Sequence, residues 1–150
     1  MIAPPNRHRH GFTITELLIA VAIVGILAAI AVPQYSSYVM RSRVLDAFAK
    51  LSDYSARMEQ YFLDRRTYLD DTGRCGIAPA ATAGSADSFQ VACTATARSF
   101  LYTASGLGNK GMAQFVYTID QTGTRATVSL PSGWRRTADC WTIRVDGGCV

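Results

Sequence analysis

The sequence predicts an α+β fold in which one long N-terminal helix, apolar in its first half and kinked at Pro33, packs on a four-stranded antiparallel sheet. Three observations predict it. The 24 residues from Leu17 to Met40 carry no charge. Helical periodicity continues beyond them, and four short segments of alternating hydrophobicity follow after residue 88. At 150 residues, the chain has room for one compact domain plus an accessory segment.

The apolar segment is long enough to cross a membrane. Its first 16 residues, 17–32, are all apolar or Gly, and about 20 such residues span a bilayer core. Residues 1–11 are polar and basic, and no charge follows the apolar segment until Arg41, so the leader is predicted to lie in the cytoplasm. A secretory signal peptide is the alternative, with residues 28–31 (Ala-Ala-Ile-Ala) as its cleavage site.

Glu16 argues against both a signal peptide and a plain membrane anchor. It lies at the start of the apolar segment. A carboxylate in hydrocarbon costs several kcal/mol unless it is paired, and neither kind of segment needs that cost. Glu16 is therefore a candidate functional residue that requires a partner.

Residues 11–17, Gly-Phe-Thr-Ile-Thr-Glu-Leu, resemble the class III signal of type IV pilins and related pseudopilins. In that family, a prepilin peptidase cuts after the glycine and N-methylates the new first residue. The resemblance implies cleavage between Gly11 and Phe12, N-methylation of Phe12, and removal of the leader, residues 1–11. Pro33 matches the proline that bends the first helix in this family.

The resemblance also implies a role for Glu16 in filament assembly. In a filament, its carboxylate would pair with the new Phe12 amine of a neighbouring subunit and set the register of the two chains. Losing one partner of such a buried pair costs about 3–5 kcal/mol. The segment departs mildly from the family pattern at Thr15, where an aliphatic residue is more usual, and at His10 before the glycine.

The helix is predicted to continue beyond the apolar segment to about residue 63. Pro33 lacks a backbone donor, so a bend or local melting is expected there. Residues 12–40 would form the transmembrane and filament-core helix, and residues 41–150 the globular head. One apolar stripe follows with helical spacing and is predicted to pack on the head: Val44, Leu45, Phe48, Leu51, Met58 and Phe62.

The head is predicted to contain the four strands. Alternation indicates them near residues 89–93, 100–102, 115–119 and 126–130. Residues 120–124 (Asp-Gln-Thr-Gly-Thr) indicate a tight hairpin with Gly at the special position. The glycine-rich run 106–111 lacks the Gly-Lys-Ser/Thr ending of a phosphate loop and is interpreted as a flexible loop between strands.

Four cysteines lie in the second half of the chain, and spacing alone leaves three disulfide pairings open. They are Cys75, Cys93, Cys140 and Cys149. None form the close pairs of a zinc site, and both histidines lie in the leader, so a catalytic cysteine would lack its partner. Pilins close a C-terminal disulfide loop, and the resemblance therefore implies pairing of Cys140 with Cys149 and of Cys75 with Cys93. The expected compartment is oxidising.

The resemblance implies a structural subunit of a type IV pilus and no enzyme, cofactor or metal site. The run 117–123 and the Cys-Trp pair at 140–141 are similar to PilE-like pilins, which are often minor components. The implied partners are other pilin subunits, the prepilin peptidase and the inner-membrane assembly machinery. The precursor would cross the inner membrane once, and the mature chain would join a surface pilus supporting adhesion, twitching motility or DNA uptake.

Two alternatives remain open. A pseudopilin of a type II secretion system shares the signal, but its head often uses calcium, and Asp70-Asp71 is the only adjacent acidic pair. A head that binds DNA or another ligand would use a basic patch near Trp134 and Trp141, formed by Arg125, Arg135, Arg136 and Arg144. The whole chain has a net charge of +4, and without the leader 13 basic and 11 acidic side chains remain. This balance of +2 is too mild to indicate nucleic acid, and a solvated surface with two structural tryptophans is the favoured interpretation.

Overall fold

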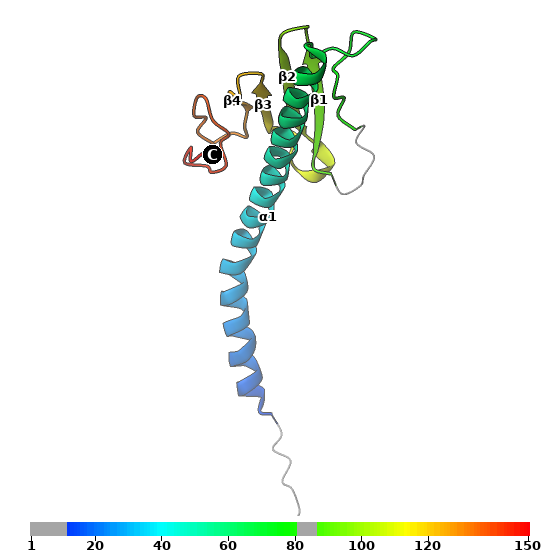
Figure 1. Ribbon diagram of the computed structural model, residues 1–150. Coiled ribbons are helices and arrows are strands. Elements are labelled where there is room, and N and C mark those ends of the chain that lie inside the picture. Colours follow the sequence, from blue (N-terminus) through cyan, green and yellow to red (C-terminus); the bar gives the residue numbers. More distant parts are fainter. Residues whose placement is uncertain (1–11, 81–86) are drawn as a thin grey trace, which may run out of the picture. The chain divides into compact units, whose positions relative to one another are not determined.

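The computed structural model describes residues 12–80 and 87–150, so Gly11 and the leader lie outside the described residues. The predicted fold is confirmed (Figure 1): one helix, α1 (Ile14–Arg65), and one four-stranded antiparallel sheet. The strands lie in the sheet in their order along the chain, as β1 (Phe89–Ala95), β2 (Phe100–Gly106), β3 (Val116–Asp120) and β4 (Arg125–Ser129).

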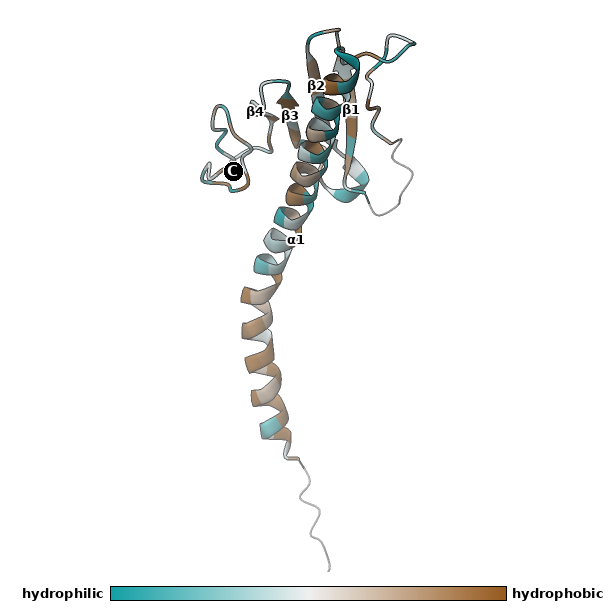
Figure 2. Ribbon diagram, viewed as in Figure 1, coloured by the Kyte–Doolittle hydropathy of each residue, from teal (hydrophilic) through white to brown (hydrophobic). Residues whose placement is uncertain are grey.

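The chain divides into two units, Met1–Tyr38 and Val39–Val150. In the first unit, α1 is long and apolar enough to cross a membrane by length and composition, and Figure 2 shows its hydrophobic residues in brown. Helical structure continues through Pro33, so the local melting that the proline suggested is not seen. The Ser36 and Ser37 hydroxyls both donate to the Pro33 carbonyl, at 2.9 and 3.1 Å.

The core of the second unit lies between α1 and the sheet. The buried residues of α1 recur at helical spacing, so that they form one face: Val44, Ala47, Phe48, Leu51 and Met58. Phe48 makes an edge contact with Tyr117 at 4.8 Å and stacks on Trp141 at 4.7 Å. The inclusion of Leu45 in the stripe was wrong. Its side chain is 46% exposed because it lies about 100° around the helix from its buried neighbour Val44.

Two turns in the head share the local sequence Asp-x-Thr-Gly. In the predicted hairpin after β3, Gly123 has φ of 76°, and Asp120 Oδ1 accepts hydrogen bonds from backbone N–H groups two and four residues on. Asp70 does the same in residues 70–74, which explains this half of the acidic pair as a turn residue. Hydrogen bonds from the Arg74 backbone and the Thr72 side chain lower the pKa of Asp70.

The glycine-rich run between β2 and β3 is shaped by local contacts. It forms a 3-10 turn, η1 (Gly108–Lys110), followed by Gly111 with φ of 70°. Arg43 of α1 donates a hydrogen bond to the Lys110 carbonyl at 2.6 Å. The run is therefore a connection anchored to α1, and it does not open a helix that could hold phosphate.

Candidate functional site

The first turn of α1 is closed by a reciprocal capping box. The Thr13 hydroxyl accepts a hydrogen bond from the Glu16 backbone N–H at 3.2 Å. In return, Glu16 Oε2 accepts hydrogen bonds from the Thr13 N–H at 3.0 Å and from the Thr13 hydroxyl at 2.8 Å. The spacing Thr-x-x-Glu is the sequence signature of this cap, and the sequence reasoning overlooked it. In the single chain, Glu16 therefore has a partner in its own helix.

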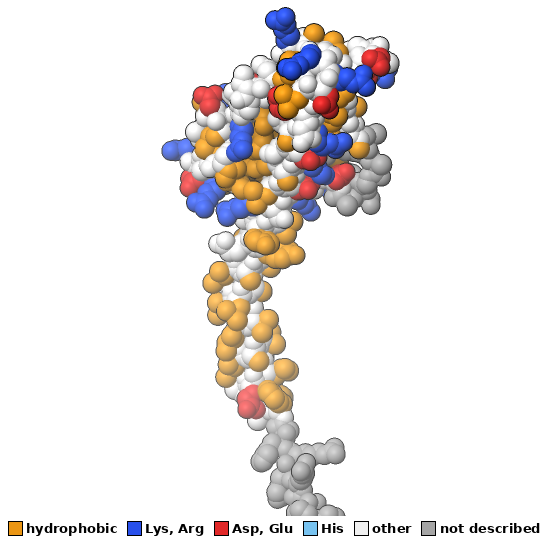
Figure 3. Space-filling view, viewed as in Figure 1, with side chains coloured by type: hydrophobic (Ala, Val, Ile, Leu, Met, Phe, Trp, Pro, Cys, Tyr) orange, Lys and Arg blue, Asp and Glu red, His pale blue; other side chains and the backbone are white. Residues whose placement is uncertain are grey.

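The apolar side chains of the first unit are exposed in the single chain. Phe12 is 81% exposed and Ile14 is 79% exposed, and most large apolar side chains that follow along α1 are more than half exposed. Figure 3 shows these side chains in orange along the first part of the helix. Soluble monomers rarely expose such a continuous apolar surface, so this segment requires a membrane or other protein chains around it.

Two disulfides fix the loops of the head. The structure joins Cys75 to Cys93, with Cα atoms 6.3 Å apart, and Cys140 to Cys149, with Cα atoms 5.9 Å apart. This is the pairing that the resemblance implies. The first bond ties the segment after α1 to β1, and the second closes the C-terminal loop.

The C-terminal tail, residues 130–150, is attached to β4 through Thr127. The Thr127 hydroxyl donates to the Cys140 carbonyl at 2.8 Å and accepts a hydrogen bond from the Thr142 N–H at 2.9 Å. The backbones of Trp141 and Val150 exchange two hydrogen bonds of 3.1 Å. The tail is therefore a defined part of the head surface beside the sheet.

The four arginines of the suggested basic patch all lie on β4 and this tail, and all four are exposed. They are Arg125, Arg135, Arg136 and Arg144. In residues 12–80 and 87–150, the salt bridges involve only the cations of Lys50 and Arg57, so none of these four guanidinium groups forms a salt bridge there. The tail also carries two exposed carboxylates, Asp139 and Asp146. Figure 3 shows Lys and Arg side chains in blue over the head, with Asp and Glu side chains in red among them. We call these four residues the arginine face.

The two tryptophans beside the arginine face have different environments. Trp141 is 1% exposed, and its indole N–H donates to the Thr118 carbonyl at 2.8 Å. Its ring is therefore structural and cannot stack on a base, which confirms the favoured interpretation for this residue. Trp134 is half-buried and makes an edge contact with Phe115 at 5.2 Å.

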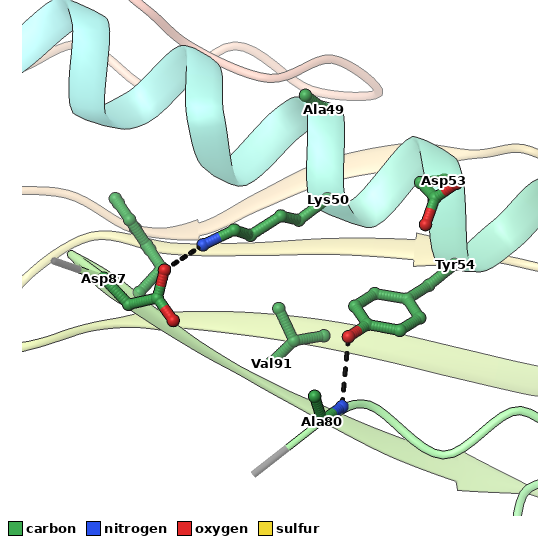
Figure 4. Close-up of a pocket in the computed structure, with 8 residues that line it drawn as sticks. Ala49, Lys50, Asp53, Tyr54, Ala80, Asp87 and Val91 are labelled. Carbon is green, nitrogen blue, oxygen red and sulfur yellow. Dashed lines mark hydrogen bonds and ion pairs between the residues drawn. The ribbon is translucent and has the colours of Figure 1, made fainter. Parts of the chain in front are cut away.

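A cavity of about 400 Å³ lies between α1 and β1. Figure 4 shows Lys50 reaching Asp87 at one end, 2.5 Å apart, and the Tyr54 hydroxyl accepting a hydrogen bond from the Ala80 N–H at 3.0 Å. Burial opposes the charged form of Lys50, but Asp87 and Asp46 outweigh it and raise the Lys50 pKa. The ion pair thus joins α1 to the residues just before β1 and gives the cavity no proton donor or acceptor suited to catalysis.

Metal chemistry has no support in the described part of the chain, where no group of three His, Cys, Asp or Glu side chains converges. The residues that the structure brings together are the Thr13–Glu16 cap, the two cystines and the arginine face. The predicted cleavage site at Gly11–Phe12 includes Gly11, which lies outside the described residues.

Comparison with known proteins agrees with these features. Residues 6–32 match the prokaryotic N-terminal methylation motif. The fimbrial protein EcpC of Eikenella corrodens is 43% identical over 68 residues, which are 45% of this chain and 44% of that protein. The type IV major pilin protein PilE of Neisseria gonorrhoeae is 37% identical over 73 residues, 49% of this chain and 44% of that protein. The chain thus spans less than half the length of these relatives.

The fold is also found in a solved structure. The non-core minor pilin PilV of Neisseria meningitidis superimposes with a TM-score of 0.50 at 17% identity, covering 64% of this chain and 93% of that one. Residues 33–128 match the model of the family described as "Type IV minor pilin ComP, DNA uptake sequence receptor". That match covers more than half of the sequence, and the chain belongs to this family of type IV minor pilins.

Proposed function

We propose that this chain is a minor subunit of a type IV pilus whose head captures DNA on the arginine face. Family membership and the helix-on-sheet fold support a structural pilus subunit and favour it over a pseudopilin. The DNA-receptor description of the family supports the ligand. The observation that carries the proposal is the arginine face itself, four exposed guanidinium groups without salt bridges among the residues described.

The chemistry of the arginine face suits the backbone of duplex DNA. Arginine makes bidentate hydrogen bonds to phosphate, and neutralising phosphates releases counterions from the duplex. One guanidinium nitrogen of Arg136 donates a hydrogen bond to the Val128 carbonyl at 3.1 Å. This bond anchors the side chain and leaves its other donors for a ligand. DNA binding, not catalysis, is the activity that we assign to the head.

Salt dependence of DNA binding tests this assignment. If all four arginines contact phosphates, log K should fall with log salt concentration with a slope of about −3.6. We expect the double variant Arg135→Ala/Arg136→Ala to lose about half of that slope and to bind a 20-bp duplex more weakly. The control variant Arg57→Ala/Arg65→Ala removes the same charge from the exposed face of α1 and should bind as the wild type does. No duplex binding by the wild type, or equal losses in both variants, would refute DNA capture by this face.

The N-terminal segment supports assembly into a filament. We propose that the leader, residues 1–11, is removed by a prepilin peptidase after Gly11 and that Phe12 is N-methylated, as the methylation motif at residues 6–32 suggests. The precursor would lie in the inner membrane with its leader in the cytoplasm. The assembly machinery would then transfer residues 12–40 into the filament core among other pilin subunits, with the head, residues 41–150, at the cell surface.

Glu16 can serve the cap and the filament together. Both hydrogen bonds from Thr13 go to Oε2, and Oε1 accepts none within the part of the chain described. We infer that Oε1 receives the N-methylated Phe12 amine of a neighbouring subunit. The cap then holds the carboxylate in a defined orientation before its partner arrives, which reduces the conformational freedom lost on pairing.

Two variants separate the charge of Glu16 from its capping role. Glu16→Gln retains an oxygen for the cap but removes the charge, and we expect it to abolish filament assembly. Thr13→Ala keeps the charge and removes the hydroxyl from the cap, at a cost of about 0.5–2 kcal/mol, and we expect it to assemble with a modest loss. Electron microscopy and immunoblotting of sheared surface fractions measure both. Normal filaments from Glu16→Gln would show that the carboxylate charge is not needed.

A further inference from the structure

We propose that Arg125 is a preorganised, two-pronged DNA contact and that the buried Trp141 is the residue that positions it. The Arg125 guanidinium lies over the Trp141 ring, 4.8 Å from the centroid. This inference rests on the proposed function, because it names one contact on the arginine face and the residue that positions it. It assigns Trp141 a role in binding although its ring is inaccessible to a ligand.

Trp141 is fixed from several directions. Its indole N–H donates to the Thr118 carbonyl of β3, and its ring stacks on Phe48 of α1 with an interplanar angle of 19°. Its backbone is paired with Val150, next to the Cys140–Cys149 disulfide. A ring held by helix, strand and tail is a rigid platform for the guanidinium above it.

Arg125 remains free to meet a ligand. It is exposed at the start of β4, and it forms no salt bridge with any residue that the structure describes. A guanidinium that contacts an aromatic face still has N–H groups available for a ligand. Because Trp141 is 1% exposed, the exposed Arg125 side chain is the layer between the indole and the solvent.

Arg57 is a useful contrast within the same head. It also lies over an aromatic ring, 5.8 Å from the centroid of Tyr54, but it forms a salt bridge with Asp53 at 3.6 Å. Its charge is compensated and its donors are directed at a carboxylate of the same helix. A ring contact alone therefore does not distinguish Arg125. Arg65 also lies over a ring, 6.0 Å from the centroid of Tyr61, and it forms no salt bridge with a described residue. Arg125 differs from both arginines because it lies closer to its ring, at 4.8 Å, and because that ring is buried and held in place.

The geometry favours a ligand group that offers two acceptor atoms side by side. The planar guanidinium presents two parallel N–H groups, which match two oxygens of a phosphate or the O6 and N7 atoms of guanine in the major groove. Prior immobilisation reduces the entropy that Arg125 would lose on binding. The same charge on a flexible lysine would lack both the stack and the paired donors.

The test uses the processed chain in detergent and two 20-bp duplexes, one rich in G·C pairs and one composed only of A·T pairs. We expect Arg125→Ala and Arg125→Lys to weaken binding at least about fivefold, with Lys rescuing little. If Arg125 contacts a phosphate, Arg125→Ala should reduce the affinity for both duplexes equally and lower the salt slope of binding by about 0.9. If Arg125 contacts guanine, only the affinity for the G·C-rich duplex should fall. Arg57→Lys is the matched control and should leave the affinity for both duplexes unchanged.

Trp141→Phe tests the positioning role. We expect it to weaken DNA binding in the wild-type background and to add nothing in the Arg125→Ala background, because coupled residues are not additive. A tryptophan that is only structural would lower the melting temperature equally in both backgrounds and leave DNA binding unchanged.

Three outcomes overturn the inference. The first is that Arg125→Lys binds both duplexes as the wild type does while Arg135→Ala/Arg136→Ala binds more weakly. That result would retain DNA capture by the head and refute the preorganised contact. Fully additive losses for Trp141→Phe and Arg125→Ala would remove the positioning role. Absence of wild-type binding to both duplexes would overturn the proposed function and this inference together.

Discussion

Replacing Phe48 by alanine perturbs the packing that holds α1 against the sheet and the tail. The side chain is 5% exposed, and it contacts Tyr117 at 4.8 Å and Trp141 at 4.7 Å between ring centroids. Truncating a buried Phe costs about 3–5 kcal/mol, and each aromatic pair contributes about 0.5–1.5 kcal/mol within that cost. We therefore expect Phe48→Ala to lower the free energy of unfolding by about 4 kcal/mol, a large part of the 5–15 kcal/mol typical of a domain.

Guanidinium unfolding of the processed, disulfide-intact chain in detergent measures this loss, with tryptophan fluorescence as the signal. Trp141 stacks on Phe48, so its fluorescence reports on the contact that is removed. Leu45→Ala is the matched control on the same helix, because Leu45 is 46% exposed, and it should cost less than about 1 kcal/mol. A loss from Leu45→Ala as large as that from Phe48→Ala would refute the assigned packing face of α1.

Three further predictions concern the turns and the tail. Burial raises the pKa of Asp120, but hydrogen bonds from the 122 and 124 positions outweigh it and lower that pKa. The resulting stability is present above the unfolded pKa near 4 and is lost as pH falls through the lower folded value. The melting temperature of Asp120→Asn should therefore fall less between about pH 6 and pH 2.5 than that of the wild type. The control variant Asp71→Asn should lose as much as the wild type does. The double variant Cys140→Ser/Cys149→Ser should lose about 2–4 kcal/mol in chemical unfolding and weaken DNA binding in anisotropy titrations; unaltered stability would contradict the role of this disulfide. Gly106→Ala would drive its Cβ into the backbone carbonyl at position 112, so its melting temperature should fall; an unchanged value would refute this close contact.

The sequence was sufficient to predict the elements that a short segment of the chain specifies. The uncharged run to Met40 and the alternating segments beyond residue 88 predicted the helix and all four strands, and the glycine at position 123 predicted the hairpin. The pairing of Cys140 with Cys149 was implied by the family resemblance and is present in the structure. These features depend on nearest neighbours along the chain or on one short loop.

Features that depend on distant residues were not predictable in the same way. The burial of Trp141 requires Phe48, Thr118 and the tail to meet, and spacing along the chain does not encode that meeting. The stacking of Arg125 on this ring follows from the same tertiary arrangement. The predicted burial of Leu45 was wrong for a different reason. Helical spacing in steps of three and four also includes residues at the edge of the apolar stripe, and only the packing in the folded head decides which of them are buried.

The capping box formed by Thr13 and Glu16 is a different case, because the local sequence was enough to predict it. Thr-x-x-Glu at residues 13–16 is a capping box, and the structure forms it. The membrane setting and the family resemblance instead predicted that Glu16 has its partner in another chain. Both interpretations remain compatible, since one carboxylate oxygen serves the cap and the other is left for the filament.

Intact mass and N-terminal sequencing of this chain from sheared surface filaments test the central claim most directly. The account predicts a chain that begins at N-methylated Phe12 and is four hydrogens lighter than its reduced form, as two disulfides require. Recovery of a chain that retains residues 1–11, or that was cut after Ala31 by a signal peptidase, would contradict processing as a pilin and the filament role of Glu16.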